Sequence, residues 1–347
     1  MVKWEALEQY FQWRKSRGAS EKFHGAVVDH CGSENTRVFK DVMEVGVNLE
    51  KLDEILGTSV QPEVAIVFDW ENRWAINDSQ GPRNCGMRYD ETVHDQYRAF
   101  WASGVSVDMI DMECDFSKYK LLVAPMLYMV RSGVGERIEA FVKNGGTFVA
   151  TYWSGIVNEN DLCFLGGFPG PLRTVLGICS EEIDSLYDYE SNSIIFNENN
   201  ELNIKGEYSV GDLCDLINVE GAKILASYKS DFYAGRPAVT MNNFGEGEAY
   251  YIASRTKKDF NENFYSKLIK KLKITRIIET ILPKGVTAQL RTDGDNDFVF
   301  LMNFNNYEEK VILEQGKYED MLSNSKLEEE IILAPYGFKI MKRKVKI

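Results

Sequence analysis

The sequence has no surplus of basic residues, and this bounds the partners it can take. Its 347 residues include 40 Lys and Arg against 53 Asp and Glu, which gives a formal net charge of −13 and a pI near 4.9. Phosphate backbones are bound through clustered Lys and Arg, so we expect no nucleic-acid partner. The longest basic cluster, residues 342–346, is predicted to be a solvated end of the chain.

Long apolar runs are also absent. No run reaches the length of about 18 residues that a membrane-spanning helix needs. Glu5 and Glu8 interrupt the region in which a secretory signal would be continuously apolar. We therefore expect no membrane partner and a cytoplasmic location.

Residues suited to metal or disulfide chemistry are few and scattered. The three histidines are His24, His30 and His94, and the six cysteines, which form no Cys-x-x-Cys pair, are Cys31, Cys85, Cys114, Cys163, Cys179 and Cys214. This pattern is typical of reduced thiols in a cytoplasmic protein and not of a disulfide framework or zinc site. We expect neither a metal nor a cofactor.

The residues that are present suffice for two or three domains, since 44% of the chain is hydrophobic. Residues 1–57 predict a single β/α unit, with an aromatic strand over 10–14, a loop over 15–34 and an amphipathic helix over 37–56. One such unit cannot bury its own faces. We therefore expect it to belong to something larger and, in this chain, to expose apolar surface.

Residues 58–283 alternate apolar runs with helical patterns. Strands are predicted over 64–68, 120–125, 146–151 and 249–253, and helices over 92–103, 133–144 and 264–272. Continuous apolar strands of this kind are typical of an open, mostly parallel α/β sheet. Residues 284–347 predict a small antiparallel β-sandwich, with strands over 286–291, 297–303, 309–313, 326–333 and 337–342.

The predicted sheet resembles the class I glutamine amidotransferase fold, in which a nucleophilic Cys follows a central strand. Here the corresponding turn, residues 152–155, reads Tyr-Trp-Ser-Gly and has no Cys. Ser154 could act as a nucleophile, but no histidine follows His94 to serve as its base. An enzyme fold reused for assembly is the better interpretation. The glycine-rich segment 166–171 lacks phosphate-loop spacing and predicts a rigid loop that shapes a surface or a subunit contact.

The loop after the first predicted strand holds Glu21 and His24. If 10–14 is a barrel strand, this loop lies at the strand's C-terminal end, where barrel enzymes place their active sites. The alternative is an exposed loop that happens to contain a Glu and a His, and residue spacing alone favours that alternative.

Several motifs together resemble family 42 glycoside hydrolases, the β-galactosidases. They are Phe-Gln-Trp-Arg at 11–14, Glu-Lys-Phe-His at 21–24, Arg-Val-Phe at 37–39, Phe-Asp-Trp-Glu-Asn at 68–72, Asn-Glu-Asn-Asp at 158–161, Leu-Gly-Gly-Phe-Pro-Gly-Pro-Leu at 165–172, Leu-Arg-Thr-Asp-Gly at 290–294 and Ala-Pro-Tyr-Gly at 334–337. The resemblance implies a last barrel unit over 1–57, an amidotransferase-like trimerisation domain over 58–283 and a C-terminal sandwich over 284–347.

The resemblance also implies a substrate and a site. Glu21, Lys22, Phe23 and His24 would form the substrate-binding edge, with Glu21 and His24 contacting a galactose ring, and the partner would be a galactoside in a homotrimer. A retaining β-galactosidase needs two carboxylates about 5–5.5 Å apart. The resemblance places both before Met1, and none of the Asn-Glu pairs that begin at Asn158, Asn197, Asn200 and Asn261 replaces them.

Three hypotheses follow. The chain is the C-terminal part of a β-galactosidase and is inactive when isolated, or it is one half of a split β-galactosidase, or it is a non-catalytic module for trimer assembly or carbohydrate binding.

Overall fold

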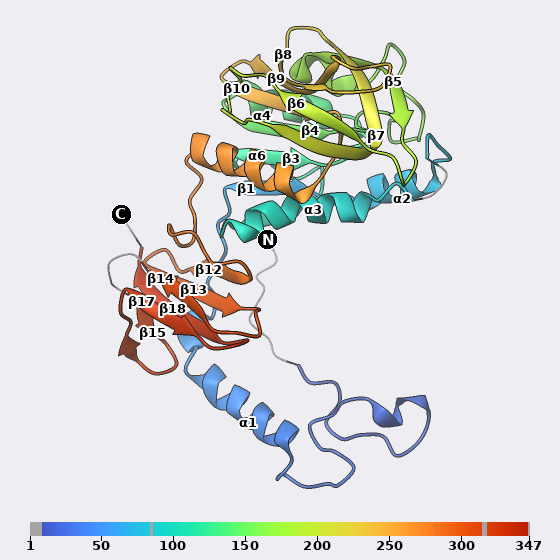
Figure 1. Ribbon diagram of the computed structural model, residues 1–347. Coiled ribbons are helices and arrows are strands. Elements are labelled where there is room, and N and C mark those ends of the chain that lie inside the picture. Colours follow the sequence, from blue (N-terminus) through green and yellow to red (C-terminus); the bar gives the residue numbers. More distant parts are fainter. Residues whose placement is uncertain (1–8, 84–85, 314–317, 346–347) are drawn as a thin grey trace. The chain divides into compact units, whose positions relative to one another are not determined.

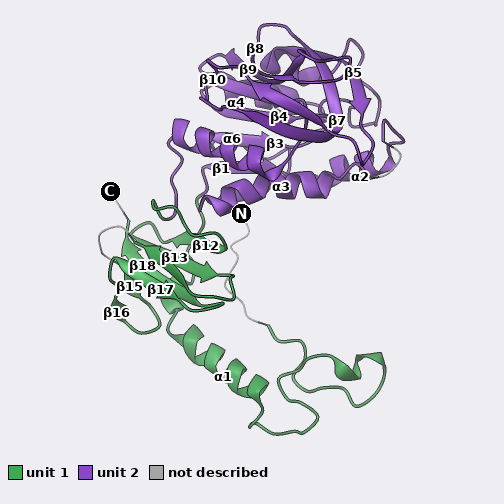
Figure 2. Cartoon of the chain, viewed as in Figure 1, with its two compact units in different colours: residues 1–61, 278–347 green, residues 62–277 purple. Residues whose placement is uncertain are grey.

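The computed structural model describes residues 9–83, 86–313 and 318–345. Glu5, Glu8, Cys85 and Lys346, which entered the predictions above, lie outside these ranges. The chain divides into two compact units, residues 1–61 with 278–347 and residues 62–277 (Figure 2). The boundaries predicted near residues 57 and 283 stay predictions.

The larger unit is built on a parallel ladder (Figure 1). Its strands run in the order β10 (Gly247–Ile252), β4 (Thr147–Thr151), β3 (Leu121–Ala124), β1 (Val64–Val67) and β2 (Val107–Ile110). Every residue of β1, β3 and β4 is buried, as expected for strands covered on both faces. The open α/β sheet predicted from the sequence is confirmed.

Beyond β10 the sheet continues with antiparallel strands that the sequence did not reveal. They are β9 (Pro237–Phe244), β8 (Lys223–Tyr228), β6 (Asn192–Phe196), β7 (Glu207–Val219) and β11 (Ser254–Thr256), with β5 (Ile178–Ser185) paired to β7. The inner part of β7 is buried on both faces. The region therefore continues the core of the α/β sheet.

Two groups of helices cover the parallel ladder. Helix α3 (Tyr89–Ala102) packs on α6 (Lys258–Lys271), with the rings of Phe100 and Tyr265 4.5 Å apart. Helix α4 (Val134–Lys143) packs with the short turns η3 (Gly170–Leu172) and α5 (Arg173–Leu176). Helix α2 (Trp70–Asp78) follows β1 directly. Among the described residues no helix has both the length and the apolarity needed to cross a membrane.

The smaller unit contains the predicted antiparallel sandwich. Its sheets are β12 (Val286–Thr292), β13 (Asn296–Asn303), β18 (Phe338–Lys344), β15 (Glu319–Asp320) and β16 (Ser325–Lys326) in one layer, and β14 (Glu309–Ile312) with β17 (Glu330–Leu333) in the other. The prediction of a solvated end was wrong for residues 342–344. They belong to β18, where Lys342 pairs with Glu54 and Arg343 binds Asp297 at 3.0 Å.

A short segment from the N-terminal part joins this sandwich. In the 3-10 turn η2 (Asp53–Ile55), Ile55 is buried against Phe298 and Ile340. Just after it, the guanidinium of Arg291 donates to Thr58 Oγ1 at 2.8 Å. Residues 52–59 are therefore anchored by burial and hydrogen bonds.

Helix α1 (Arg37–Glu50) has no such anchor. Thr36 caps it by accepting the Phe39 N–H at 3.3 Å, but none of its 14 residues is buried. Val38, Val45 and Leu49, which share its apolar face, are exposed to solvent. The prediction of an amphipathic helix is thus confirmed, although the helix ends at Glu50 and not at residue 56. Its apolar side is left facing water, as expected for a single β/α unit.

The strand predicted over 10–14 is present only as an isolated parallel bridge between Arg14 and Val28. A strand is held by hydrogen bonds to neighbours, and this segment pairs only with the few residues around Val27 and Val28. The aromatic side chains that suggested the strand, including Phe11 and Trp13, are exposed.

We predict that amide hydrogens of residues 37–50 exchange fast, because an isolated helix of about 12–15 residues is marginal in water. Amides of β1, β3 and β4 should be protected by orders of magnitude more, since those strands are fully buried. Hydrogen exchange read by mass spectrometry on the 347-residue chain measures both. Equal protection in the two regions would show that α1 has found a packing partner in solution.

Candidate functional site

The four residues predicted to bind substrate lie together at the tip of one loop. Glu21, Lys22 and Phe23 belong to the 3-10 turn η1 (Ser20–Phe23), and His24 follows as its C-cap, with its backbone N–H donating to Glu21 O at 2.9 Å. All four are exposed. The loop therefore presents a carboxylate, an ammonium, an aromatic ring and an imidazole from consecutive positions.

The base of this loop is held closed by its own backbone. The Val28 N–H donates to Trp13 O at 2.8 Å, and the Lys15 N–H donates to Val28 O at 3.1 Å. An ion pair between Lys15 Nζ and Asp29 Oδ2 at 2.7 Å adds to the closure, as does the 2.9 Å hydrogen bond from His30 Nε2 to Ser16 O. A loop with its ends joined in this way can display its tip to a ligand.

The turn after β4 occupies the position at which an amidotransferase-like fold would hold its nucleophile. Trp153 takes that place, with a backbone φ of 58° and a buried side chain stacked on Tyr128 at 5.4 Å. Gly155 follows at φ 65°, where a Cβ would lie 2.1 Å from the Pro169 carbonyl oxygen. The backbone of the turn is strained at Trp153, and the indole of that residue is buried.

Ser154, the alternative nucleophile weighed from the sequence, has a structural role. Its buried hydroxyl donates to Thr151 O at 2.7 Å and accepts the Leu127 N–H at 2.9 Å. Its one donor and one of its two acceptor lone pairs are thus used in joining two loops.

A buried carboxyl group lies behind the same turn. Asp215 on β7 accepts the Trp153 N–H at 3.1 Å and the Tyr251 hydroxyl at 2.5 Å, both at Oδ2. Burial raises the pKa of Asp215 to about 7, against the two hydrogen bonds that lower it. No sequence pattern pointed to this group, because β7 was not recognised as a strand.

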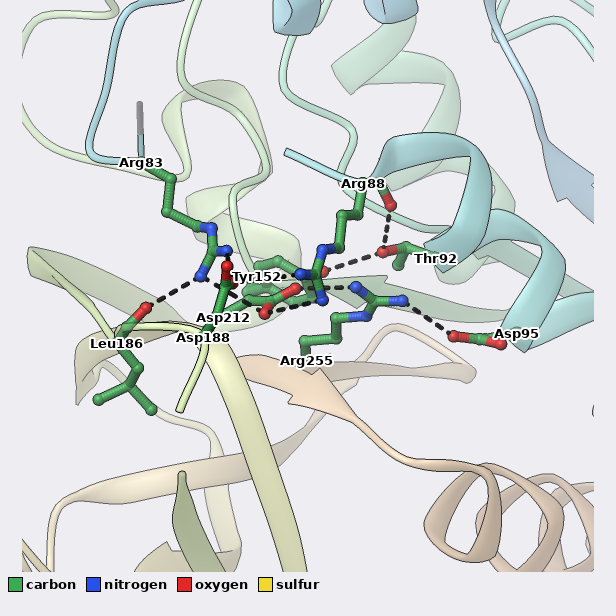
Figure 3. A network of polar contacts seen from close by, with 9 residues as sticks. All are labelled: Arg83, Arg88, Thr92, Asp95, Tyr152, Leu186, Asp188, Asp212 and Arg255. Carbon is green, nitrogen blue, oxygen red and sulfur yellow. Dashed lines mark hydrogen bonds and ion pairs between the residues drawn. The ribbon is translucent and has the colours of Figure 1, made fainter. Parts of the chain in front are cut away.

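Next to the turn, three arginines and three aspartates form a charge-balanced network. Figure 3 shows its members, Arg83, Arg88, Thr92, Asp95, Tyr152, Leu186, Asp188, Asp212 and Arg255. Asp212 is bound by Arg255 at 2.8 Å, and Arg88 contacts both Asp188 and Asp212. Arg88 and Asp212 both have positive φ. The network joins α3, β7, β11 and two loops. We therefore interpret it as a structural network that stabilises the strained backbone at Arg88 and Asp212.

A second ionic cluster lies at the carboxyl ends of β1 and β2. The Arg131 guanidinium binds Asp69 at 2.6 Å, Glu71 at 2.7 Å and Asp111 at 2.9 Å, and Glu113 lies 3.9 Å away. Burial raises the pKa of Asp69 to about 6, and a hydrogen bond shared with Asp111 adds to the rise. Carboxyl edges of open sheets are where ligands usually bind. Here the side chain of Arg131 lies between the carboxylates.

Metal binding finds no support in the part of the chain that the structure describes. Within residues 9–83, 86–313 and 318–345, no three or more His, Cys, Asp or Glu side chains are grouped so that they could hold a metal ion. The five cysteines in those ranges are free thiols.

An open α/β sheet domain followed by an antiparallel sandwich is thus the class that the fold defines. Three family models match parts of the chain. The β-galactosidase trimerisation domain matches residues 62–275, the β-galactosidase C-terminal domain matches 285–343, and the β-galactosidase model itself matches 7–52. Since the first of these alone spans more than half of the chain, the chain belongs to the family 42 β-galactosidases.

Individual relatives agree with this assignment. Beta-galactosidase Pbg of Clostridium perfringens is 60% identical over 97% of this chain and 49% of its own length. The crystal structure of the β-galactosidase from Rahnella sp. R3 superposes with a TM-score of 0.93 at 55% identity, over 97% of this chain and 49% of that one. Gan42B, a β-galactosidase from G. stearothermophilus, gives a TM-score of 0.92 at 43% identity, over 97% and 48%. The chain spans about half the length of these relatives.

The buried carboxyl group generates a pH prediction. Asp215 has an ordinary pKa of 3.8 and a folded-state pKa of about 7, so the folded protein holds its proton more tightly than the unfolded chain does. The resulting stability is complete below about pH 4 and is lost as the pH rises through 7. Asp215→Asn keeps the shape but cannot ionise. Relative to this variant, the wild-type free energy of unfolding should fall by a few kcal/mol between about pH 4.5 and pH 7.5.

Urea denaturation followed by tryptophan fluorescence at both pH values measures the difference. Asp78→Asn, at an exposed carboxylate at the end of α2, is the matched control and should track the wild type. Parallel pH profiles for wild type and Asp215→Asn would mean that the carboxyl group ionises normally in the fold.

Proposed function

We propose that the chain is the C-terminal half of a retaining β-galactosidase that hydrolyses terminal, non-reducing β-D-galactose residues. On its own it is inactive, because the resemblance places both catalytic carboxylates outside it. It supplies a sugar-contacting loop, Glu21 to His24, and the domain through which three copies assemble. The observation that carries the proposal is the closed loop with those four residues exposed at its tip.

The chemistry of the loop suits a sugar. A carboxylate accepts hydrogen bonds from hydroxyl groups, an imidazole can donate or accept, and an exposed aromatic ring such as that of Phe23 packs on the apolar face of a pyranose. In the family resemblance these residues complete a barrel active site. The exposed apolar face of α1 supports the same proposal, since a neighbouring barrel segment would cover it.

Two alternatives differ in what supplies the remaining half. In a split enzyme, a separately made barrel fragment docks on the loop and α1 and restores activity. As a module for trimer assembly or carbohydrate binding, the chain would act without catalysis, which fits the structural role of the buried Ser154 in the turn after β4. The cytoplasmic location proposed for all three rests on the free cysteines and on the absence of a disulfide framework in the described residues.

We predict no hydrolysis of a nitrophenyl β-galactoside by the purified chain. Co-expression with the N-terminal half of the Clostridium perfringens relative should restore turnover, because the two chains are 60% identical across the shared region. Release of nitrophenol above the rate without enzyme, by the chain alone, would overturn the proposal. No gain on co-expression would favour the assembly or binding module.

In the complemented enzyme, Glu21→Gln and His24→Ala should each lower kcat/KM about 10- to 100-fold, since each removes a charge-assisted or polar contact to the substrate. Glu34→Gln, at an exposed carboxylate of the same loop region, is the control and should leave kcat/KM unchanged. If Glu21→Gln behaves like Glu34→Gln, the loop does not contact the sugar.

A further inference from the structure

In the Phe-Asp-Trp-Glu-Asn segment at 68–72, the three polar side chains bind partners within the same unit. Asp69 caps α2 by accepting the Asn72 N–H at 2.9 Å and also binds Arg131, which Glu71 binds as well. The Asn72 amide is buried and donates to Met126 O at 3.1 Å. Trp70, in contrast, is 56% exposed, and its neighbour Trp74, 6.2 Å away on the same helix, is 60% exposed.

The loop of residues 126–132 connects these tryptophans to a second apolar group. On one side it is bound to α2, since the Met129 N–H donates to Asn72 Oδ1 at 2.8 Å. On the other side the Val130 N–H donates to Val157 O at 2.9 Å, and the Ser132 N–H donates to Glu159 at 3.2 Å. The segment that begins there carries Leu162 and Leu165, which are 62% and 97% exposed. Two pairs of large apolar side chains therefore border one loop.

We name these four residues, Trp70, Trp74, Leu162 and Leu165, the carboxyl-edge surface. Its rim is acidic, because Glu71, Asp111 and Glu113 are exposed around Arg131. Counted with Asp69, four carboxylates face one guanidinium, a formal balance of −3. Apolar patches with tryptophan at the centre and charges at the rim are typical of protein interfaces.

We propose that the carboxyl-edge surface is the contact through which one copy of this chain binds the next copy in a ring. The inference rests on the proposed assembly function, and on the match of residues 62–275 to a trimerisation domain. A three-fold ring has head-to-tail contacts, so each copy must carry two different, complementary patches. The acidic rim therefore requires a basic counterpart elsewhere on the same unit.

Helix α6 and the residues after it supply that counterpart. Between residues 257 and 276 there are seven cations, Lys257, Lys258, Lys267, Lys270, Lys271, Lys273 and Arg276, against the two anions Asp259 and Glu262, a formal balance of +5. Within a chain of net charge −13 this stretch stands out. Lys257, Lys258, Lys270 and Lys273 are exposed. Opposite charges on the two patches set the register of a head-to-tail contact.

A second copy fits this surface better than a saccharide does. Tryptophan and carboxylates also occur in sugar sites, but Leu165, almost fully exposed, offers nothing to hydroxyl groups. Tryptophan is enriched at the desolvated centre of subunit contacts, and exposed leucines add apolar area to such a centre.

The test is the mass of the chain in solution. Sedimentation velocity should show a trimer for the wild type, and Trp70→Ala/Trp74→Ala should raise the dissociation constant about 30-fold or more, as for an interface hot spot. Tyr187→Ala/Tyr189→Ala removes another exposed aromatic pair, stacked 5.4 Å apart, and should leave the trimer intact. Far-UV circular dichroism melts check that the variants fold, and Trp70→Phe/Trp74→Phe should retain most of the association.

A charge exchange identifies the counterpart. Glu113→Lys and Lys270→Glu should each weaken the trimer about tenfold, and the double variant should recover most of that loss. Additive weakening in the double variant would overturn the pairing with α6.

The remaining outcomes distinguish a failure of this inference from a failure of the proposed assembly function. A wild type that is monomeric at all concentrations would contradict the proposed assembly function. A trimer unaffected by Trp70→Ala/Trp74→Ala would overturn only this inference. Tryptophan fluorescence that responds to galactose or lactose, with no change in mass on substitution, would identify a saccharide site and also overturn it.

Discussion

The Arg131 guanidinium gathers carboxylates from the ends of two neighbouring parallel strands, and much of the larger unit depends on that contact. Asp69 follows β1 and caps α2, while Asp111 follows β2, so one cation fixes the carboxyl edge of the sheet. Removing the cation would leave a buried carboxylate without its partner, which costs several kcal/mol in proteins. In an open α/β enzyme this edge would be free for a ligand. Here the Arg131 side chain lies between the carboxylates and holds them in place, which suits a surface for assembly.

Much of the fold could be predicted because its elements have clear periodicity. Strands β1, β3 and β4 lie within the predicted runs and are buried on both faces, and such strands appear in the sequence as continuous apolar segments. The antiparallel strands of the larger unit were missed because their apolar residues follow no clear period. Strand β5 reads Ile-Cys-Ser-Glu-Glu-Ile-Asp-Ser and is partly exposed, so neither alternation nor a continuous run marks it. The aromatic segment 10–14 suggested a strand, but propensity does not form one when hydrogen-bonding neighbours are few.

The candidate-site residues also differ in whether they could be predicted from the sequence. Glu21 and His24 could be singled out only through the family resemblance, since an exposed loop with a Glu and a His is common. Ser154 could be set aside from the sequence because no histidine follows it, and its two hydrogen bonds give the structural reason. Asp215, Arg131 and the exposure of Trp70 could not be predicted, because each depends on segments far apart in the chain. For Asp69 alone a signal was present, a carboxylate directly after a buried strand.

Helix α1 has one further consequence, which concerns the amount of the protein in a cell. A 14-residue helix with valines and a leucine exposed to water is the kind of segment that chaperones and proteases recognise. A segment that covers the apolar face of α1 shields it from chaperones and proteases. The steady-state level of this chain would then depend on the supply of the covering segment. Copies of the chain without that segment would be degraded, which would keep the two in equal amounts.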